Sequence, residues 1–279
     1  MLRRLFFTLC TLGLPLLLGA AEPANVKVLY LTGHTDRHHS CKEMRSEIVP
    51  LLEGKESFEV TVVELADSTY TMGVHFRDFD VVVLNINEVW WDRSLKRDFE
   101  RYMRHGGGLV VLHEADNAFP EWEAFNRMTA LGGWGGREKE AGPFFYWRDG
   151  KPYTDYTSEG SAGKHGKRVP FRIQNRCATH PIMRTLPTSW MHYEDELYGD
   201  LRGPAEGIEV LATAYSDAST GGTGKEEVAL FTIRYGKGRI FHCTLGHTKK
   251  GNRKALLNTE FRTLIVRGTE WAANGEVRD

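Results

Sequence analysis

Several common catalytic and binding signatures are missing from this 279-residue sequence. Its four cysteines form no CxxC pair and no Cys/His zinc-ribbon spacing, which excludes a disulfide-rich scaffold and a structural zinc module. Neither a P-loop nor a GxGxxG after a strand occurs, so we expect no nucleotide cofactor. The 36 basic and 37 acidic residues form no block of one sign, so nothing indicates nucleic acid or an anionic membrane as a partner.

The only long hydrophobic run lies at the N-terminus. Arg3 and Arg4 precede an apolar stretch from Leu5 to Leu18, and small residues follow up to Ala21. This pattern predicts a signal peptide over residues 1–21, and the run is short for a membrane span. We therefore expect an exported protein, periplasmic or secreted, with no stable membrane insertion after cleavage. Residues 22–279 are predicted to form a single domain.

Apolar runs alternate with helical periods through the first half of this domain. This alternation predicts parallel strands joined by right-handed crossovers, which is an α/β fold with a doubly wound, mainly parallel sheet in three layers. Residues 131–168, rich in glycine and aromatics, show no regular pattern and are predicted to line a cleft over the strand ends. The expected strands are 26–31, 58–65, 80–86, 109–112, 169–173, 208–215, 227–235 and 239–245, and the expected helices are 43–52, 94–105, 120–128 and 259–271.

His113 and Glu114 follow the buried strand 109–112 directly. Ligands of open α/β sheets bind outside the carboxyl ends of the strands, where a nucleophile-elbow enzyme carries Ser or Cys. Neither Ser nor Cys follows this strand, so chemistry at this point must use imidazole, carboxylate or a metal. We predict catalytic roles for His113 and Glu114.

Polar residues follow other predicted strands in the same way. His34 and His247 each come just after a strand, and Glu196 lies in an acidic triplet flanked by aromatic residues. Imidazoles and a carboxylate suit a divalent transition metal such as zinc, or general acid–base catalysis near neutral pH. We therefore expect His34, His113, Glu196 and His247 to meet in one cleft as a metal or acid–base site. His38 and His39 are interpreted as solvated loop residues.

Further residues are candidates for contact with a substrate. Trp91, at a strand end, and Trp134, in the glycine-rich stretch, are suited to stacking on the face of a sugar. His180 precedes a proline and is placed in a turn, while Asp195 shares the acidic triplet with Glu196. His34 is included among these candidate substrate contacts.

The order of several short motifs resembles the ThuA-like (trehalose-utilisation) family over residues 26–273. The motifs are LTGH at 31–34, VVLNINEVWW at 82–91, GGGLVVLHEAD at 106–116, THPI at 179–182, EDELY at 194–198 and YGKGRIFHCTLGHT at 235–248. The resemblance implies a flavodoxin-like, class I glutamine amidotransferase-like fold without the catalytic cysteine. Many members have a histidine where this chain has Trp134-Gly135-Gly136-Arg137, so Arg137 is expected to donate hydrogen bonds to substrate in its place.

The family's association with trehalose and related disaccharides implies a carbohydrate partner. We expect an exported enzyme that transforms a disaccharide or keto-sugar by isomerisation, elimination or hydrolysis, with His113, Glu114 and Glu196 as catalytic residues. The alternative is a carbohydrate-binding protein that keeps the cleft without catalysis. Glutamine amidotransferase activity is not expected, because no cysteine stands at the elbow. A homo-oligomer is compatible with the sequence.

Overall fold

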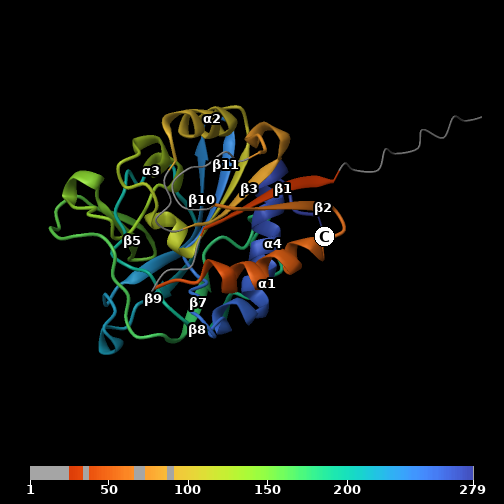
Figure 1. The fold of residues 1–279 in the computed structure, drawn as a ribbon. Coiled ribbons are helices and arrows are strands. Elements are labelled where there is room, and N and C mark those ends of the chain that lie inside the picture. Colours follow the sequence, from red (N-terminus) through yellow and green to blue (C-terminus); the bar gives the residue numbers. More distant parts are fainter. Residues whose placement is uncertain (1–24, 34–37, 66–72, 87–90, 279) are drawn as a thin grey trace, which may run out of the picture.

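Five parallel strands form the first half of the central sheet (Figure 1). In this computed structural model, which describes residues 25–33, 38–65, 73–86 and 91–278, they lie in the order β2-β1-β3-β4-β11. Neighbouring strands in this half are all parallel, as the α/β pattern predicts. Their bounds are β1 Val26–Thr32, β2 Phe58–Glu64, β3 Val81–Asn85, β4 Gly108–Leu112 and β11 Gly238–Cys243.

Helices cover both faces of this half and give the predicted three layers. α1 and α4 pack against one face, and α2 and α3 lie on the other (Figure 1). Side chains alternate along β1, so that Tyr30 joins the first core and Leu31 joins the second. The helices are α1 Cys41–Glu53, α2 Arg93–Arg104, α3 Glu123–Thr129 and α4 Thr259–Asn274.

Local sequence signals start the longer helices. The side chains of Ser40, Asp92 and Asn258 accept a hydrogen bond from a first-turn N–H of α1, α2 and α4 respectively. Gly108 at the start of β4 allows a close approach, since a Cβ there would lie 2.5 Å from the carbonyl oxygen of Ala272 in α4. Short 3₁₀ helices are η1 Phe76–Asp78, η2 His113–Asn117, η3 Lys139–Ala141, η4 Ala218–Thr220 and η5 Lys254–Leu257.

The second half of the sheet is antiparallel and continues from β11 in the order β10-β9-β7-β8. The stretch 131–168, predicted without regular structure, contains a hairpin of β5 and β6, and β5 pairs with the end of β10. The chain thus adds an antiparallel lobe beside the doubly wound half. The bounds are β5 Phe144–Arg148, β6 Lys151–Asp155, β7 Val169–Asn175, β8 Ser189–Asp195, β9 Glu209–Tyr215 and β10 Glu226–Tyr235.

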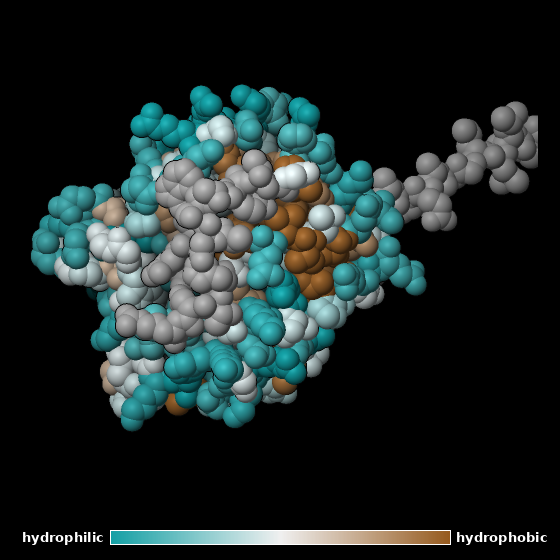
Figure 2. Space-filling view, viewed as in Figure 1, coloured by the Kyte–Doolittle hydropathy of each residue, from teal (hydrophilic) through white to brown (hydrophobic). Residues whose placement is uncertain are grey.

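A buried arginine holds the hairpin region in place. The guanidinium of Arg202 donates hydrogen bonds to the carbonyl oxygens of Gly142, Ser158 and Gly160, at 2.7, 2.6 and 2.9 Å. It lies 3.5 Å from the ring centroid of Phe144, and the residue is 1% exposed. These bonds add to the main-chain hydrogen bonds that join residues 132, 145, 163 and 164 to residues 199–202. Where it is coloured, the face of the molecule seen in Figure 2 is mainly hydrophilic, with one hydrophobic patch near β1 and β2.

Candidate metal centre

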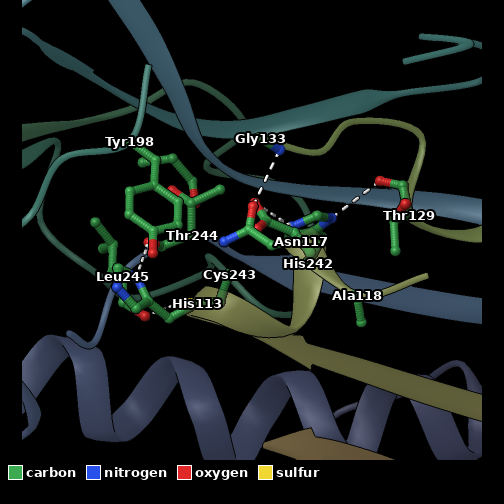
Figure 3. A network of polar contacts seen from close by, with 12 residues as sticks. His113, Asn117, Ala118, Thr129, Gly133, Tyr198, His242, Cys243, Thr244 and Leu245 are labelled. Atoms are coloured by element: carbon green, nitrogen blue, oxygen red, sulfur yellow. Dashed lines mark hydrogen bonds and ion pairs between the residues drawn. The ribbon is translucent and has the colours of Figure 1, made fainter. Parts of the chain in front are cut away.

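His113 begins η2 directly after β4, in a strained conformation. Its φ is +42°, in the left-handed region that a residue with a Cβ rarely adopts. Its Nδ1 lies 2.7 Å from the carbonyl oxygen of Thr244, which only accepts, so Nδ1 carries the proton and the lone pair of Nε2 is directed elsewhere (Figure 3). Burial, and then the neighbouring His247, lower the pKa of His113, which favours the neutral ring.

His247 reaches the same edge of the sheet because β11 runs parallel to β4. Leu112 pairs with Cys243, so both strands end at the same level before the two histidines. The backbone N–H groups of Gly246 and His247 donate to the carboxylate of Asp195 at 2.8 and 2.9 Å. As a result, His247 Nδ1 lies 3.3 Å from His113 Nε2.

Glu196 approaches this pair from the antiparallel lobe, immediately after β8. Its Oε2 lies 3.1 Å from Nδ1 of His247, and its side chain is 9% exposed. Burial alone would raise the pKa of Glu196, but the hydrogen bond from His247 and the neighbouring histidines outweigh it and lower the pKa to about 2. Glu196 is therefore an ionised carboxylate at neutral pH.

His39 completes the group; it lies in a loop, as the sequence-based interpretation has it, but it is half-buried rather than solvated. Its ring centroid lies 5.3 Å from that of His113 and 5.1 Å from that of His247. Its Nε2 lies 3.0 Å from the hydroxyl of Tyr198, whose ring stacks on His113 at 4.1 Å. The available signal was its position just before Ser40, the N-cap of α1, in the loop that leaves β1. His34, which we expected here, lies outside the described residues.

The donor atoms of His39, His113, Glu196 and His247 all lie within 4.8 Å of one another. A tetrahedral ion bound at about 2.0–2.2 Å holds its donors about 3.3–3.6 Å apart. The two separations given above, 3.3 and 3.1 Å, are close to this value. Three imidazoles and one carboxylate are thus able to hold a divalent transition metal.

A cavity of about 930 Å³ opens beside these residues. His39, Glu196 and His247 line it, together with Trp134, whose ring lies 4.6 Å from Tyr198. Trp91 also borders the cavity but is only 2% exposed, since it packs against Phe76, Phe99, Phe119 and Trp122. Of the two tryptophans, Trp134 therefore offers the more accessible ring to a ligand.

The structure places the other predicted contacts away from the cavity. Glu114 does not line the cavity, and Cys41 Sγ lies 3.6 Å from its Oε1. Arg137 is buried and donates to the carbonyl oxygens of residues 116, 117, 118 and 133. His180 packs against Trp271, and its Nδ1 accepts from the N–H of Ile182. Asp195 is 1% exposed, and hydrogen bonds from four protein groups occupy its carboxylate.

The match to known proteins decides the family. The model of the trehalose-utilisation family ThuA matches residues 27–272. The chain belongs to the ThuA family. A crystal structure of a ThuA-like protein from Parabacteroides merdae is similar, with 39% identity, a TM-score of 0.86, and coverage of 91% of this chain and 92% of that one. A ThuA-like protein from Bacteroides uniformis shares the fold at 15% identity, with a TM-score of 0.62 and coverage of 95% and 97%.

A search of curated proteins found no match. The family and the similar structures agree with the predicted flavodoxin-like, class I amidotransferase-like α/β fold. Within the described ranges, no helix is both long enough and apolar enough to cross a membrane.

Proposed function

We propose that this ThuA family member is an exported enzyme that transforms a disaccharide or keto-sugar at a metal centre. The observation that carries the proposal is the convergence of His39, His113, Glu196 and His247 at the edge of a cavity. Three of the four donor residues, His39, Glu196 and His247, line this cavity, so a bound ion would lie within reach of a ligand there. Family membership supports a carbohydrate as the partner.

Each residue of the site would have its own role. A bound divalent ion would supply Lewis acidity toward a carbonyl or hydroxyl oxygen of the sugar. The hydrogen bond from His113 Nδ1 to the carbonyl oxygen of Thr244 fixes the ring and leaves Nε2 as the atom that would hold the ion. Trp134 provides an aromatic wall for a sugar ring. His165 lines the same cavity with its side chain 39% exposed, so it can exchange a proton with a bound sugar.

The metal itself is tested by elemental analysis of protein purified without chelator or polyhistidine tag. We expect about one equivalent of a divalent transition metal in the wild type, and strongly reduced metal in His113→Ala and His247→Ala. His105→Ala is the matched control, because this exposed histidine lies at the end of α2, outside the candidate site, and its Nδ1 bonds to the carbonyl oxygen of Arg101. Full metal content in His113→Ala would contradict the assignment of the ligands.

Activity is tested by a screen of native and oxidised disaccharides with product detection. His113→Ala should lower turnover at least about 100-fold, in the range expected for a group that acts directly on the reaction. Sugar binding without turnover in the metal-loaded wild type would instead favour a carbohydrate-binding protein. For export, intact-mass analysis of secreted or periplasmic protein should give a chain that begins at Glu22, and a retained Met1 would contradict cleavage.

A further inference from the structure

The geometry points to a sugar that carries a carboxylate as the ligand of this cavity, with Arg168 as the residue that binds the carboxylate. The inference rests on the proposed function, because it names the class of carbohydrate that the same site would take. It is carried by the charged side chains that line the cavity and by the partners that each of them has.

One end of the cavity is electrically balanced. Lys96 Nζ lies 2.9 Å from Oε1 of Glu121, and both residues line the cavity. The same ammonium lies 5.3 Å from the ring centroids of Phe119 and Trp122. Lys96 therefore has a counter-ion and an aromatic environment of its own, and this end needs no charge from a ligand.

Among the described residues, the other end of the cavity, next to the metal centre, has more cations than carboxylates. Arg168 reaches Oε1 of Glu196 only through Nε, at 3.5 Å, and its terminal nitrogens have no hydrogen-bond partner among the described residues. Lys249 also lines the cavity and forms no ion pair within the described part of the chain. Among the described side chains that line this end, Glu196 is the one carboxylate beside the cations of Arg168 and Lys249.

A bound metal would increase this imbalance. With three neutral imidazoles and one carboxylate, a divalent ion keeps one positive charge, and the charge of Glu196 is then shared with the ion. Arg168 and Lys249 then lack a full counter-charge among the described residues, and a cleft with an excess of one sign of charge favours a ligand of the opposite sign. The two oxygens of a carboxylate match the planar fork of a guanidinium. A sugar ring beside Trp134 would bring such a carboxylate, as in an aldonate or uronate, toward Arg168.

The test is calorimetric titration of the protein as purified, at low ionic strength, with its metal content measured in the same sample. Cellobionate should bind at least about tenfold more tightly than neutral cellobiose. Arg168→Gln should weaken cellobionate binding roughly 10- to 100-fold, the range for losing hydrogen bonds to a charged group, without changing cellobiose binding. Arg168→Lys, which keeps the charge and loses the fork, should fall between them. Arg172→Gln is the control, because this exposed arginine on β7 lies outside the cavity.

Three results would overturn the inference. Equal affinity for cellobionate and cellobiose would show that no anion site exists. Loss of metal from Arg168→Gln would make Arg168 a positioning residue for Glu196 rather than a substrate contact. Tighter binding of glucose 6-phosphate than of cellobionate would assign the cations to a phosphate. If the wild type holds metal and binds cellobiose as tightly as cellobionate, only the preference for a carboxylate is refuted. If it lacks metal and binds neither sugar, the proposed function is refuted as well.

Discussion

Asp195→Asn should destabilise the whole domain, because all the hydrogen-bonding capacity of this buried carboxylate is used inside the protein. Oδ1 accepts from the backbone N–H groups of Glu196 and His247, at 2.8 and 2.9 Å. Oδ2 accepts from His192 Nε2 and from the N–H of Gly246, both at 2.8 Å. The pKa of Asp195 is lowered because the interaction with His192 and the other donors outweighs the cost of burial.

An asparagine leaves two donors unpaired whichever way its amide is turned. If the NH₂ group replaces Oδ1, the N–H groups of residues 196 and 247 both lose their acceptor. If it replaces Oδ2, the N–H of Gly246 is orphaned, and His192 must move its proton to Nδ1, which has no partner among the described residues. Each unsatisfied buried group costs about 1–3 kcal/mol, so we expect a loss of about 4 kcal/mol in the free energy of unfolding.

Urea unfolding followed by fluorescence measures this loss. With a slope of about 3 kcal/mol per M, the midpoint should fall by more than about 1 M. Glu194→Gln is the control, since its exposed ion pair with Lys254 should contribute less than about 1 kcal/mol. The sequence-based expectation that Asp195 contacts substrate predicts the reverse pattern. A stability change under about 1 kcal/mol, together with weaker sugar binding, would refute the positioning role.

Two more predictions concern the core. Burial raises the pKa of Glu227 to about 7, against 4.5 for the free side chain. Between these two values the native state holds a proton that the unfolded chain releases. The free energy of unfolding should therefore fall by about 3 kcal/mol as the pH rises from about 4.5 through 7. Urea titrations at pH 5 and 8 should show this difference shrinking in Glu227→Gln, and an equal fall in both proteins would disprove it. Gly268→Ala would place a Cβ 2.0 Å from the ring of Phe241, so the melting temperature should drop by an amount equivalent to about 2 kcal/mol; a rise would contradict the close packing of α4 on β11.

The doubly wound half could be predicted because its elements are specified locally. Long apolar runs and helical periods place β1, β3, β4, α1 and α2 within one or two residues of the prediction. The rule that parallel strands end at one edge also brought His113 and His247 together correctly in space. It required β11 to run parallel to β4, which the structure shows.

The remaining errors arise where tertiary contacts decide. The hairpin β5–β6 depends on Arg202 and on pairing with β10, neither of which leaves a periodic pattern in residues 131–168. Adjacent residues His113 and Glu114 diverge because the 3₁₀ turn of η2 sends the second side chain toward Cys41. Arg137 has the residue type of an anion binder, but the turn around it presents carbonyl oxygens that occupy its guanidinium.

The attachment of the β5–β6 hairpin has a consequence for how this part of the lobe opens. Among the described residues its ladder with β10 is the single pair Trp147–Glu226, whereas residues 132, 163 and 164 of the same segment are held by main-chain bonds to residues 199–202. Segments fixed by few contacts open at a lower free energy than the global unfolding transition, as a separate cooperative unit. Hydrogen exchange in residues 144–155 would then proceed by sub-global opening, while the cavity wall and the parallel strands that carry His113 and His247 stay folded.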